Sequence, residues 1–180
     1  MTRQIWVPSE DVCDWLRSKY AYDASTGNFS FIETDRPVKL QTPKNGYKTI
    51  KLSNAKLGVR CYVLAHRLAW FLHYGTFPAF EIDHVDTNKA NNRIDNLRDA
   101  THQQNHQHCP KKVKRIGGVF TSQYKGVAWH KRDQVWMVQI KVDGRSIHLG
   151  NFRDEHEAAC AYNKAATRFF GEFALVNELS

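Results

Sequence analysis

The sequence lacks the features that mark a membrane protein or a disulfide-bonded secreted domain. Its four cysteines lie far apart and include no Cys-x-x-Cys pair, so neither a structural zinc knuckle nor a dense disulfide framework is indicated. No apolar run approaches the length that spans a bilayer, and the N-terminus has no signal-peptide stretch. We therefore expect a soluble protein of the reducing cytoplasm, without a membrane partner.

Acidic residues are also missing from one long segment of the chain. Residues 36–80 contain eight lysines and arginines but no aspartate or glutamate. The formal net charge of the whole chain is +8, and half of that surplus lies in residues 111–122. A single lysine is more often a solvated residue than a ligand. Positive charge that is concentrated in this way, however, is typical of a protein that binds a polyanion.

The chain is long enough for one domain or two small ones. It has 180 residues, of which 42% are hydrophobic and 12% aromatic, so it can build packed cores. Residues 109–122 show neither a helical nor a strand period, and they contain Pro110 and a pair of glycines, as linkers do. The sequence therefore predicts a first domain at 1–108, a basic linker at 109–122 and a second domain at 123–180.

Helix and strand patterns occur in both parts, which favours an α+β fold. In the first part they predict a helix at about 9–20, a turn at Gly27 between two strands, a strand at 47–52 and a core helix at 63–74. In the second part they predict strands at 126–130, 135–142 and 145–150, then an alanine-rich helix at 154–170. The second part should be a small three-stranded antiparallel sheet packed on one helix.

Asp83 and His84 form the most informative pair in the sequence, at the end of a short extended run. A helix that begins near Thr101 brings Asn105 back toward them, and Asn96 lies between, so the predicted order is strand, loop, strand, helix. Carboxylate and amide oxygens suit a hard divalent cation, and an imidazole can deprotonate water. This set of residues favours a metal-dependent nuclease.

Other interpretations of these residues remain open at this point. Asp83, Asn96 and Asn105 can each serve as a turn, cap or surface residue. His66 and His73 lie on the predicted core helix, where a core or rim histidine is a simpler interpretation than a metal ligand. A rival zinc cluster with looser spacing would use His102, His106, His108 and Cys109.

Several short motifs follow one another in residues 20–108. They are His66-Arg67-Leu68-Ala69-Trp70, Ile82-Asp83-His84, Asn91-Asn92-Arg93, Asp95-Asn96-Leu97-Arg98 and Gln104-Asn105. This series resembles the HNH nucleases of the ββα-metal class, especially phage and intron homing endonucleases. The resemblance implies that Asp83 and Asn105 bind the metal, that His84 is the general base and that Asn96 clamps the loop. Because the last position is Asn105 rather than the histidine often found there, it implies Mg²⁺ or Mn²⁺ rather than zinc.

A second series of motifs occupies residues 123–177. It includes Tyr124-Lys125-Gly126-Val127, Leu149-Gly150, Glu157-Ala158-Ala159 and Ala165-Ala166. The series resembles the plant ethylene-response-factor (Apetala-type) DNA-binding domain, whose sheet lies in the major groove. The resemblance implies DNA contacts from Trp129, Lys131, Arg132, Trp136, Gln139, Lys141, Arg145 and His148. Trp136 fits a core position under the helix equally well. Ala128 and His148 stand where that family usually has arginine and tryptophan, so no base preference is implied.

The leading hypothesis is a site-specific DNA endonuclease of the HNH homing type, encoded by a phage or intron and acting in a bacterial cytoplasm. It would cut double-stranded DNA as a monomer, nicking one strand, with a divalent metal and no nucleotide cofactor. Further phosphate contacts are expected from Lys44, Lys48, Lys51, Arg93, Lys111, Lys112, Lys114 and Arg115. The alternative is a catalytically silent DNA-binding transcriptional regulator.

Overall fold

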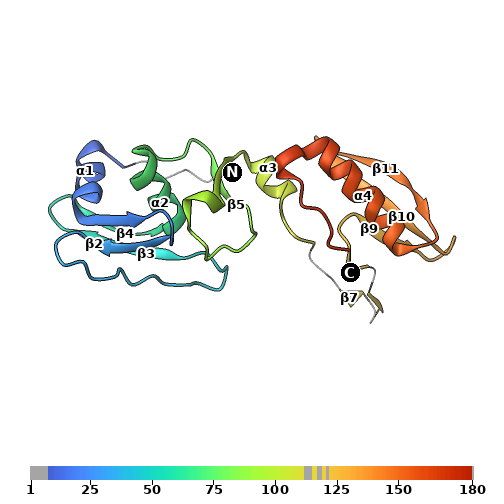
Figure 1. The fold of residues 1–180 in the computed structure, drawn as a ribbon, viewed down its shortest axis with the longest axis horizontal. Helices are drawn as coiled ribbons and strands as arrows, with labels where there is room; N and C mark the ends of the chain where they lie inside the picture. The colour runs from blue at the N-terminus through green and yellow to red at the C-terminus, as the bar shows by residue number, and fades with distance from the viewer. Residues whose placement is uncertain (1–7, 112–114, 117–118, 121, 180) are drawn as a thin grey trace. The chain divides into compact units, whose positions relative to one another are not determined.

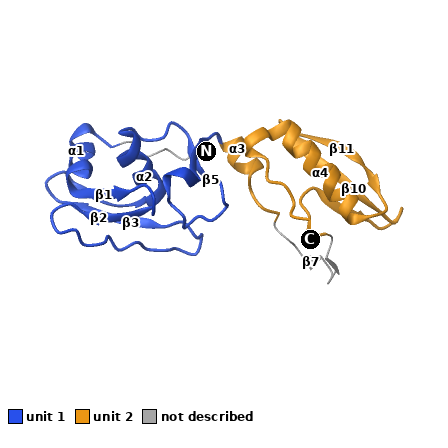
Figure 2. Ribbon diagram, in the orientation of Figure 1, with its two compact units in different colours: residues 1–101 blue, residues 102–180 orange. Residues whose placement is uncertain are grey.

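The computed structural model describes residues 8–111, 115–116, 119–120 and 122–179, and the chain divides into two compact units (Figures 1 and 2). The first unit spans residues 1–101 and the second spans residues 102–180. Both units combine helices with small antiparallel sheets, which confirms the predicted α+β class. No helix within the described ranges is long and apolar enough to cross a membrane.

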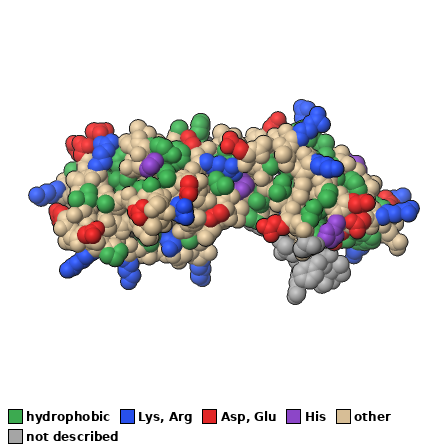
Figure 3. All heavy atoms as spheres, in the orientation of Figure 1, with side chains coloured by type: hydrophobic (Ala, Val, Ile, Leu, Met, Phe, Trp, Pro, Cys, Tyr) green, Lys and Arg blue, Asp and Glu red, His purple; other side chains and the backbone are tan. Residues whose placement is uncertain are grey.

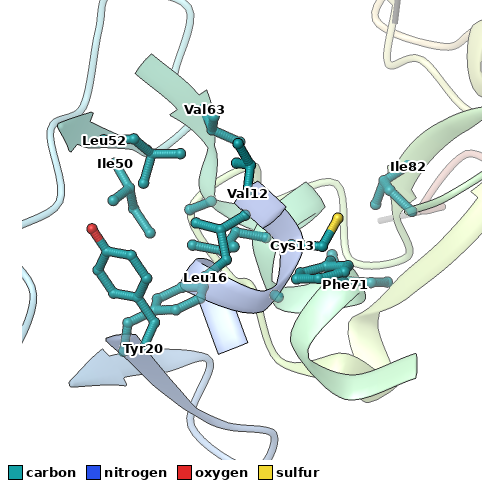
Figure 4. Packing of buried hydrophobic residues seen from close by; sticks show 14 residues of the cluster. Val12, Cys13, Leu16, Tyr20, Ile50, Leu52, Val63, Phe71 and Ile82 are labelled. Carbon is teal, nitrogen blue, oxygen red and sulfur yellow. The ribbon is translucent and has the colours of Figure 1, made fainter. Parts of the chain in front are cut away.

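Two helices and two hairpins build the core of the first unit. The helices are α1 (Glu10–Lys19) and α2 (Ala65–Tyr74), and the hairpins pair β1 (Tyr20–Asp23) with β2 (Asn28–Phe31) and β3 (Thr49–Asn54) with β4 (Val59–Leu64). Their buried side chains meet in one cluster (Figure 4). Alternation along β3 buries Ile50 and Leu52 but leaves Lys51 exposed. The hydrophobic core therefore packs against one face of each of these two hairpins.

A third hairpin carries the residues that the sequence singled out. It pairs β5 (Glu81–His84) with β6 (Leu97–Ala100), and the loop between them ends in the 3-10 turn η1 (Ile94–Asn96). Asp83 lies opposite Arg98, and His84 lies opposite Leu97. The strand, loop, strand order predicted from the sequence is therefore present in the first unit.

The turn between β1 and β2 braces the loop of this third hairpin. Gly27 adopts φ +75°, and a Cβ atom added there would lie 2.7 Å from the backbone of both Asn92 and Arg93. The amide of Ile94 donates to the carbonyl of Ala24 at 3.1 Å. Two segments that are distant in sequence therefore touch backbone to backbone, and only glycine allows this approach.

The second unit is a three-stranded sheet covered by one long helix. The sheet has the order β11 (Arg145–Phe152), β10 (Val135–Val142), β9 (Val127–His130), and α4 (Glu155–Phe170) packs against it. The helix buries Ala158, Ala159, Tyr162 and Ala166. Because three of these residues are alanines, the helix can approach the sheet closely. This confirms the predicted sheet packed on one helix. The remaining elements are α3 (His102–Gln107), β7 (Arg115–Ile116), β8 (Val119–Phe120) and η2 (Gly171–Phe173).

Two local predictions were wrong. Val63 and Leu64 end strand β4 rather than starting the core helix, because their backbone continues the ladder with β3. The segment 109–122 was predicted to have no regular structure, yet β7 and β8 pair within it as a short antiparallel hairpin. Two-residue strands are too short to give a readable period. The domain bounds 1–108, 109–122 and 123–180 stay a prediction.

The tight packing of the β1–β2 turn gives a stability prediction. Gly27→Ala should lower the free energy of unfolding of the first unit by about 2 kcal/mol or more, because it adds both φ strain and a backbone clash. Gly58→Ala is the matched control, since Gly58 has φ +64° but nothing within 4 Å of an added Cβ. Urea unfolding of both variants measures the difference. Equal losses would mean that the contact with Asn92 and Arg93 contributes nothing.

Candidate active site

Asp83 and His84 are both buried at the end of β5, with 5% and 3% of their surface exposed. Neighbouring residues of a strand point to opposite faces, so a strand of polar residues would normally expose one of the two. Burial of an adjacent carboxylate and imidazole is costly unless each has partners. Asp83 and His84 therefore each need interaction partners inside the protein.

The carboxylate of Asp83 is bound to the guanidinium of Arg98. Arg98 donates to the same oxygen, Oδ2, from Nε at 2.9 Å and from Nη2 at 2.7 Å. The two side chains lie directly opposite each other on β5 and β6, with 6% and 16% of their surfaces exposed. A pair this well shielded holds Asp83 in one rotamer and offsets the cost of burying its charge.

The ring of His84 is packed against other aromatic rings and one amide. His66 lies edge-on at 5.1 Å between ring centroids, Tyr47 lies at 5.9 Å, and the amide oxygen of Asn92 is 3.4 Å from Nε2. Burial lowers the pKa of His84, although the hydrogen bond to Asn92 and the nearby carboxylates of Asp83 and Asp86 act in the opposite direction. The lowered pKa favours the neutral ring, which is the form that can accept a proton.

His66 forms part of the same cluster. It is buried on α2, and burial, followed by the effects of His84 and Arg67, lowers its pKa to about 3. Its Nδ1 atom has no hydrogen-bond partner among the described residues. The sequence favoured a core or rim histidine for both His66 and His73; His66 lies in the core and His73 is exposed near the end of α2.

Asn96 ties the loop between β5 and β6 into one shape. Its Nδ2 donates to Asp86 Oδ1 and to the carbonyl of Asn91, and its Oδ1 accepts from the amide of Asp86, all at 2.9 Å. Its own carbonyl accepts from the amide of Val85 at 2.9 Å. One buried side chain thus binds both ends of the loop, which is the geometry expected of a loop clamp.

Asn105 lies on α3 in the second unit, where it is half-buried, whereas Asp83 lies in the first unit. Their pairing as metal ligands stays a prediction. In the described part of the chain, no group of three or more His, Cys, Asp or Glu side chains could hold a metal ion. A single buried carboxylate fits a cation such as Mg²⁺, which keeps water and substrate phosphate as most of its ligands.

The basic residues predicted to touch phosphate are placed differently from one another. Lys44 and Lys51 are exposed, Lys48 is half-buried, and Arg93 pairs with Asp95 at 2.8 Å on the surface. Lys and Arg side chains stand out along the edge of the first unit formed by the segment between β2 and β3 (Figure 3).

Lysine side chains connect the basic segment between the two sequence-predicted domains to the residues that follow it, through hydrogen bonds to backbone carbonyls. Lys111 donates to the carbonyls of Tyr124 and Val127 at 2.7 and 2.8 Å, so its ammonium group is bound within the protein. Lys125 donates to the carbonyl of Cys109 at 2.8 Å. Arg115 lies in β7, and Lys112 and Lys114 lie outside the described residues. Phosphate contact by Lys111 would require it to leave these carbonyls.

The sheet of the second unit separates its candidate DNA contacts by face. Gln139 and His148 are paired in register, and exposed Lys141 lies two residues along on the same face. Trp129 and Trp136 are paired on the opposite face, with ring centroids 4.9 Å apart, and Trp136 packs against the core. Arg145 pairs with Val142, which shares the core side. Lys131 and Arg132 are exposed in the turn between β9 and β10.

Asn92 and His66 are the site residues that sequence reasoning missed. Both touch His84, but they come from a loop and a helix at sequence distances that no local period connects. The only available signal was their presence inside the recognised motifs.

The HNH endonuclease family model matches residues 63–107, which include α2, the third hairpin and α3. An uncharacterised HNH endonuclease of Acanthamoeba polyphaga mimivirus is 30% identical over 160 residues, covering 85% of this chain and 76% of the relative. Protein 3.8 of Escherichia phage T7 is 30% identical over 110 residues, covering 61% of this chain and 86% of that protein. The chain therefore belongs to the HNH endonuclease family.

Two further similarities cover part of the chain. APETALA2-like protein 2 of Oryza sativa is 39% identical over 67 residues, which are 37% of this chain but 15% of the plant protein. The solved structure of the HNH homing endonuclease I-HmuI, described by its DNA binding and cleavage, matches with a TM-score of 0.41 and 33% identity. That match covers 49% of each chain.

The buried ion pair gives a second stability prediction. Arg98→Met should lower the free energy of unfolding by about 3 kcal/mol, because it leaves the buried Asp83 carboxylate without its guanidinium. Arg93→Met is the matched control, since it removes an exposed pair with Asp95 and should cost less than about 1 kcal/mol. Chemical unfolding at neutral pH compares the two. Similar small losses would show that Arg98 does not offset the burial of Asp83.

Proposed function

We propose that this member of the HNH endonuclease family is a metal-dependent DNA endonuclease in which His84 activates the attacking water. The observation that carries the proposal is a buried His84, with its pKa lowered by that burial, beside Asp83 at the start of a loop fixed by Asn96. A neutral imidazole can take the proton of a water molecule as that water attacks a phosphodiester. A rigid loop keeps the imidazole aimed while it does so.

Asp83 and Asn105 would hold the divalent cation, Mg²⁺ or Mn²⁺. When bound, the cation would supply a Lewis acid that stabilises the negative charge on the leaving 3′ oxygen. Asp83 suits this role because it is a hard oxygen donor held in one rotamer by Arg98. Arg98 places positive charge beside Asp83, where it would also attract a phosphate group.

The second unit would anchor the protein on double-stranded DNA. The similarity to a plant APETALA2-like protein supports this role, as does the exposed polar face of the sheet that carries Gln139, Lys141 and His148. A small cutting unit has little surface for reading bases, so a second unit extends the contact. With one candidate active site per chain, a monomer would nick one strand per binding event. This makes a site-specific homing-type endonuclease the function that fits best.

The catalytic assignment can be tested on supercoiled plasmid carrying a cleavable site, with Mg²⁺ or Mn²⁺ present. His84→Ala should reduce the rate of nicking by about 10²- to 10⁴-fold, because the general base is lost. His73→Ala is the control, since His73 is exposed on α2 and should leave the rate unchanged. Parental nicking by His84→Ala would exclude His84 as the base. Wild-type protein that binds DNA but never cuts it would favour the silent regulator instead.

The DNA contact of the second unit can be tested by the salt dependence of binding, in the His84→Ala background so that DNA stays intact. Lys141→Ala should weaken binding and reduce the slope of log affinity against log salt by about 1, the value for one phosphate contact. Lys164→Ala removes the same charge from the exposed side of α4 and serves as the control. Equal slopes for the two variants would place the DNA elsewhere.

A further inference from the structure

The polar side chain of Asn92 is buried, although the residues on either side of it in the sequence are more exposed. Only 2% of its surface is exposed, whereas Asn91 is half-buried and Arg93 is exposed. A buried amide must be hydrogen-bonded or its burial is costly. Its Nδ2 atom has no hydrogen-bond partner among the described residues. The free-energy cost of burying Asn92 must therefore be offset by hydrogen bonds of its other polar atoms.

The backbone of Asn92 is held from outside its own loop. The hydroxyl of Tyr22 donates to the carbonyl of Asn92 at 2.7 Å, and Gly27 lies against the same peptide. Burial, with smaller effects from nearby carboxylates, raises the pKa of Tyr22 to about 12, so the hydroxyl keeps its proton. The β1–β2 hairpin therefore fixes where Asn92 stands, independently of the clamp made by Asn96.

From this position the Oδ1 atom of Asn92 faces Nε2 of His84 at 3.4 Å. In the part of the chain that the structure describes, this is the only hydrogen bond of the His84 ring. A neutral imidazole carries its proton on one nitrogen, and the partner of each nitrogen decides which one. An amide oxygen can only accept, so it selects the form with the proton on Nε2.

We propose that Asn92 is a positioning residue that holds His84 in the Nε2–H form and so reserves Nδ1 as the nitrogen that accepts the proton. This inference rests on the proposed role of His84 as general base. When Nδ1 takes a proton from water, both ring nitrogens become donors, and the amide oxygen still accepts from Nε2–H. The same contact therefore serves the ring before and after proton transfer.

The opposite orientation of the amide would give a different site. Nδ2 would then donate to Nε2 of His84, and the ring would carry its proton on Nδ1. The base would have no lone pair left on Nδ1, and after proton uptake at Nε2 the imidazolium would face an amide N–H. Each amide orientation therefore predicts a distinct tautomer that can be observed directly.

The test is the tautomer of His84 in the metal-free full-length protein, measured by long-range ¹H–¹⁵N correlation NMR after labelling of histidines. The signal is assigned by its loss in His84→Gln, and the pH is kept where the ring is neutral. We expect the proton on Nε2 in the wild type. A wild-type ring with its proton on Nδ1 would overturn the proposal without any need for a variant.

Two variants of Asn92 and one control separate positioning from packing. Asn92→Asp keeps an oxygen acceptor and should keep the Nε2–H form, whereas Asn92→Leu removes it and should give a mixture of tautomers. Asn28→Leu changes an exposed asparagine on β2 and should leave the spectrum unchanged. A single Nε2–H form in folded Asn92→Leu would also overturn the proposal, because something else would then select the tautomer.

Kinetics supply the functional readout. Asn92→Leu should lower kcat for nicking by about 10²-fold with KM for DNA unchanged, since the base is misdirected but the DNA contacts remain. A rise in KM at constant kcat would instead assign Asn92 to DNA binding. The NMR result does not depend on cleavage, so it stands even if His84→Ala still cuts and the proposed function fails.

Discussion

The loop between β5 and β6 must hold one shape although it has almost no ladder of backbone hydrogen bonds. Asn96 binds Asp86 and the carbonyl of Asn91 from within, and the hydroxyl of Tyr22 holds the carbonyl of Asn92 from the first hairpin. Residues close in sequence make the inner bonds. The outer bond comes from the β1–β2 hairpin, so the geometry of the loop also depends on the packing of the first unit.

Burial of the site has opposite consequences for its two adjacent residues. For His84, burial lowers the pKa and therefore favours the neutral ring. For Asp83, the same burial removes the water that would solvate its carboxylate, which is costly unless a positive charge is close. Arg98 supplies that positive charge at 2.7 Å. The ion pair thus compensates the burial of Asp83 directly beside a histidine whose pKa is lowered by burial.

The sequence predicted the elements whose patterns are long or whose signals are strictly local. Gly75 caps α2 in a left-handed conformation, and the alternation of β10 and the alanines of α4 are readable because they extend over two or more turns or pleats. Strands β7 and β8 are two residues long each, so the sequence shows no strand periodicity there. Asn92 and His66 meet His84 only through tertiary packing, so no pattern in the chain could place them beside it.

DNA cleavage and DNA binding favour opposite degrees of solvent exposure for the side chains that carry them out. The proposed base and metal-binding carboxylate would work best where water is scarce, because electrostatic interactions strengthen there. Contacts to phosphates and bases need polar side chains that are exposed before DNA binds. Gln139, Lys141 and His148 are exposed on the sheet of the second unit. One small surface cannot easily satisfy both demands. In the proposed function, the buried Asp83 and His84 would serve cleavage and the exposed sheet of the second unit would serve DNA binding. A substitution on that sheet should then alter binding without disturbing the chemical step.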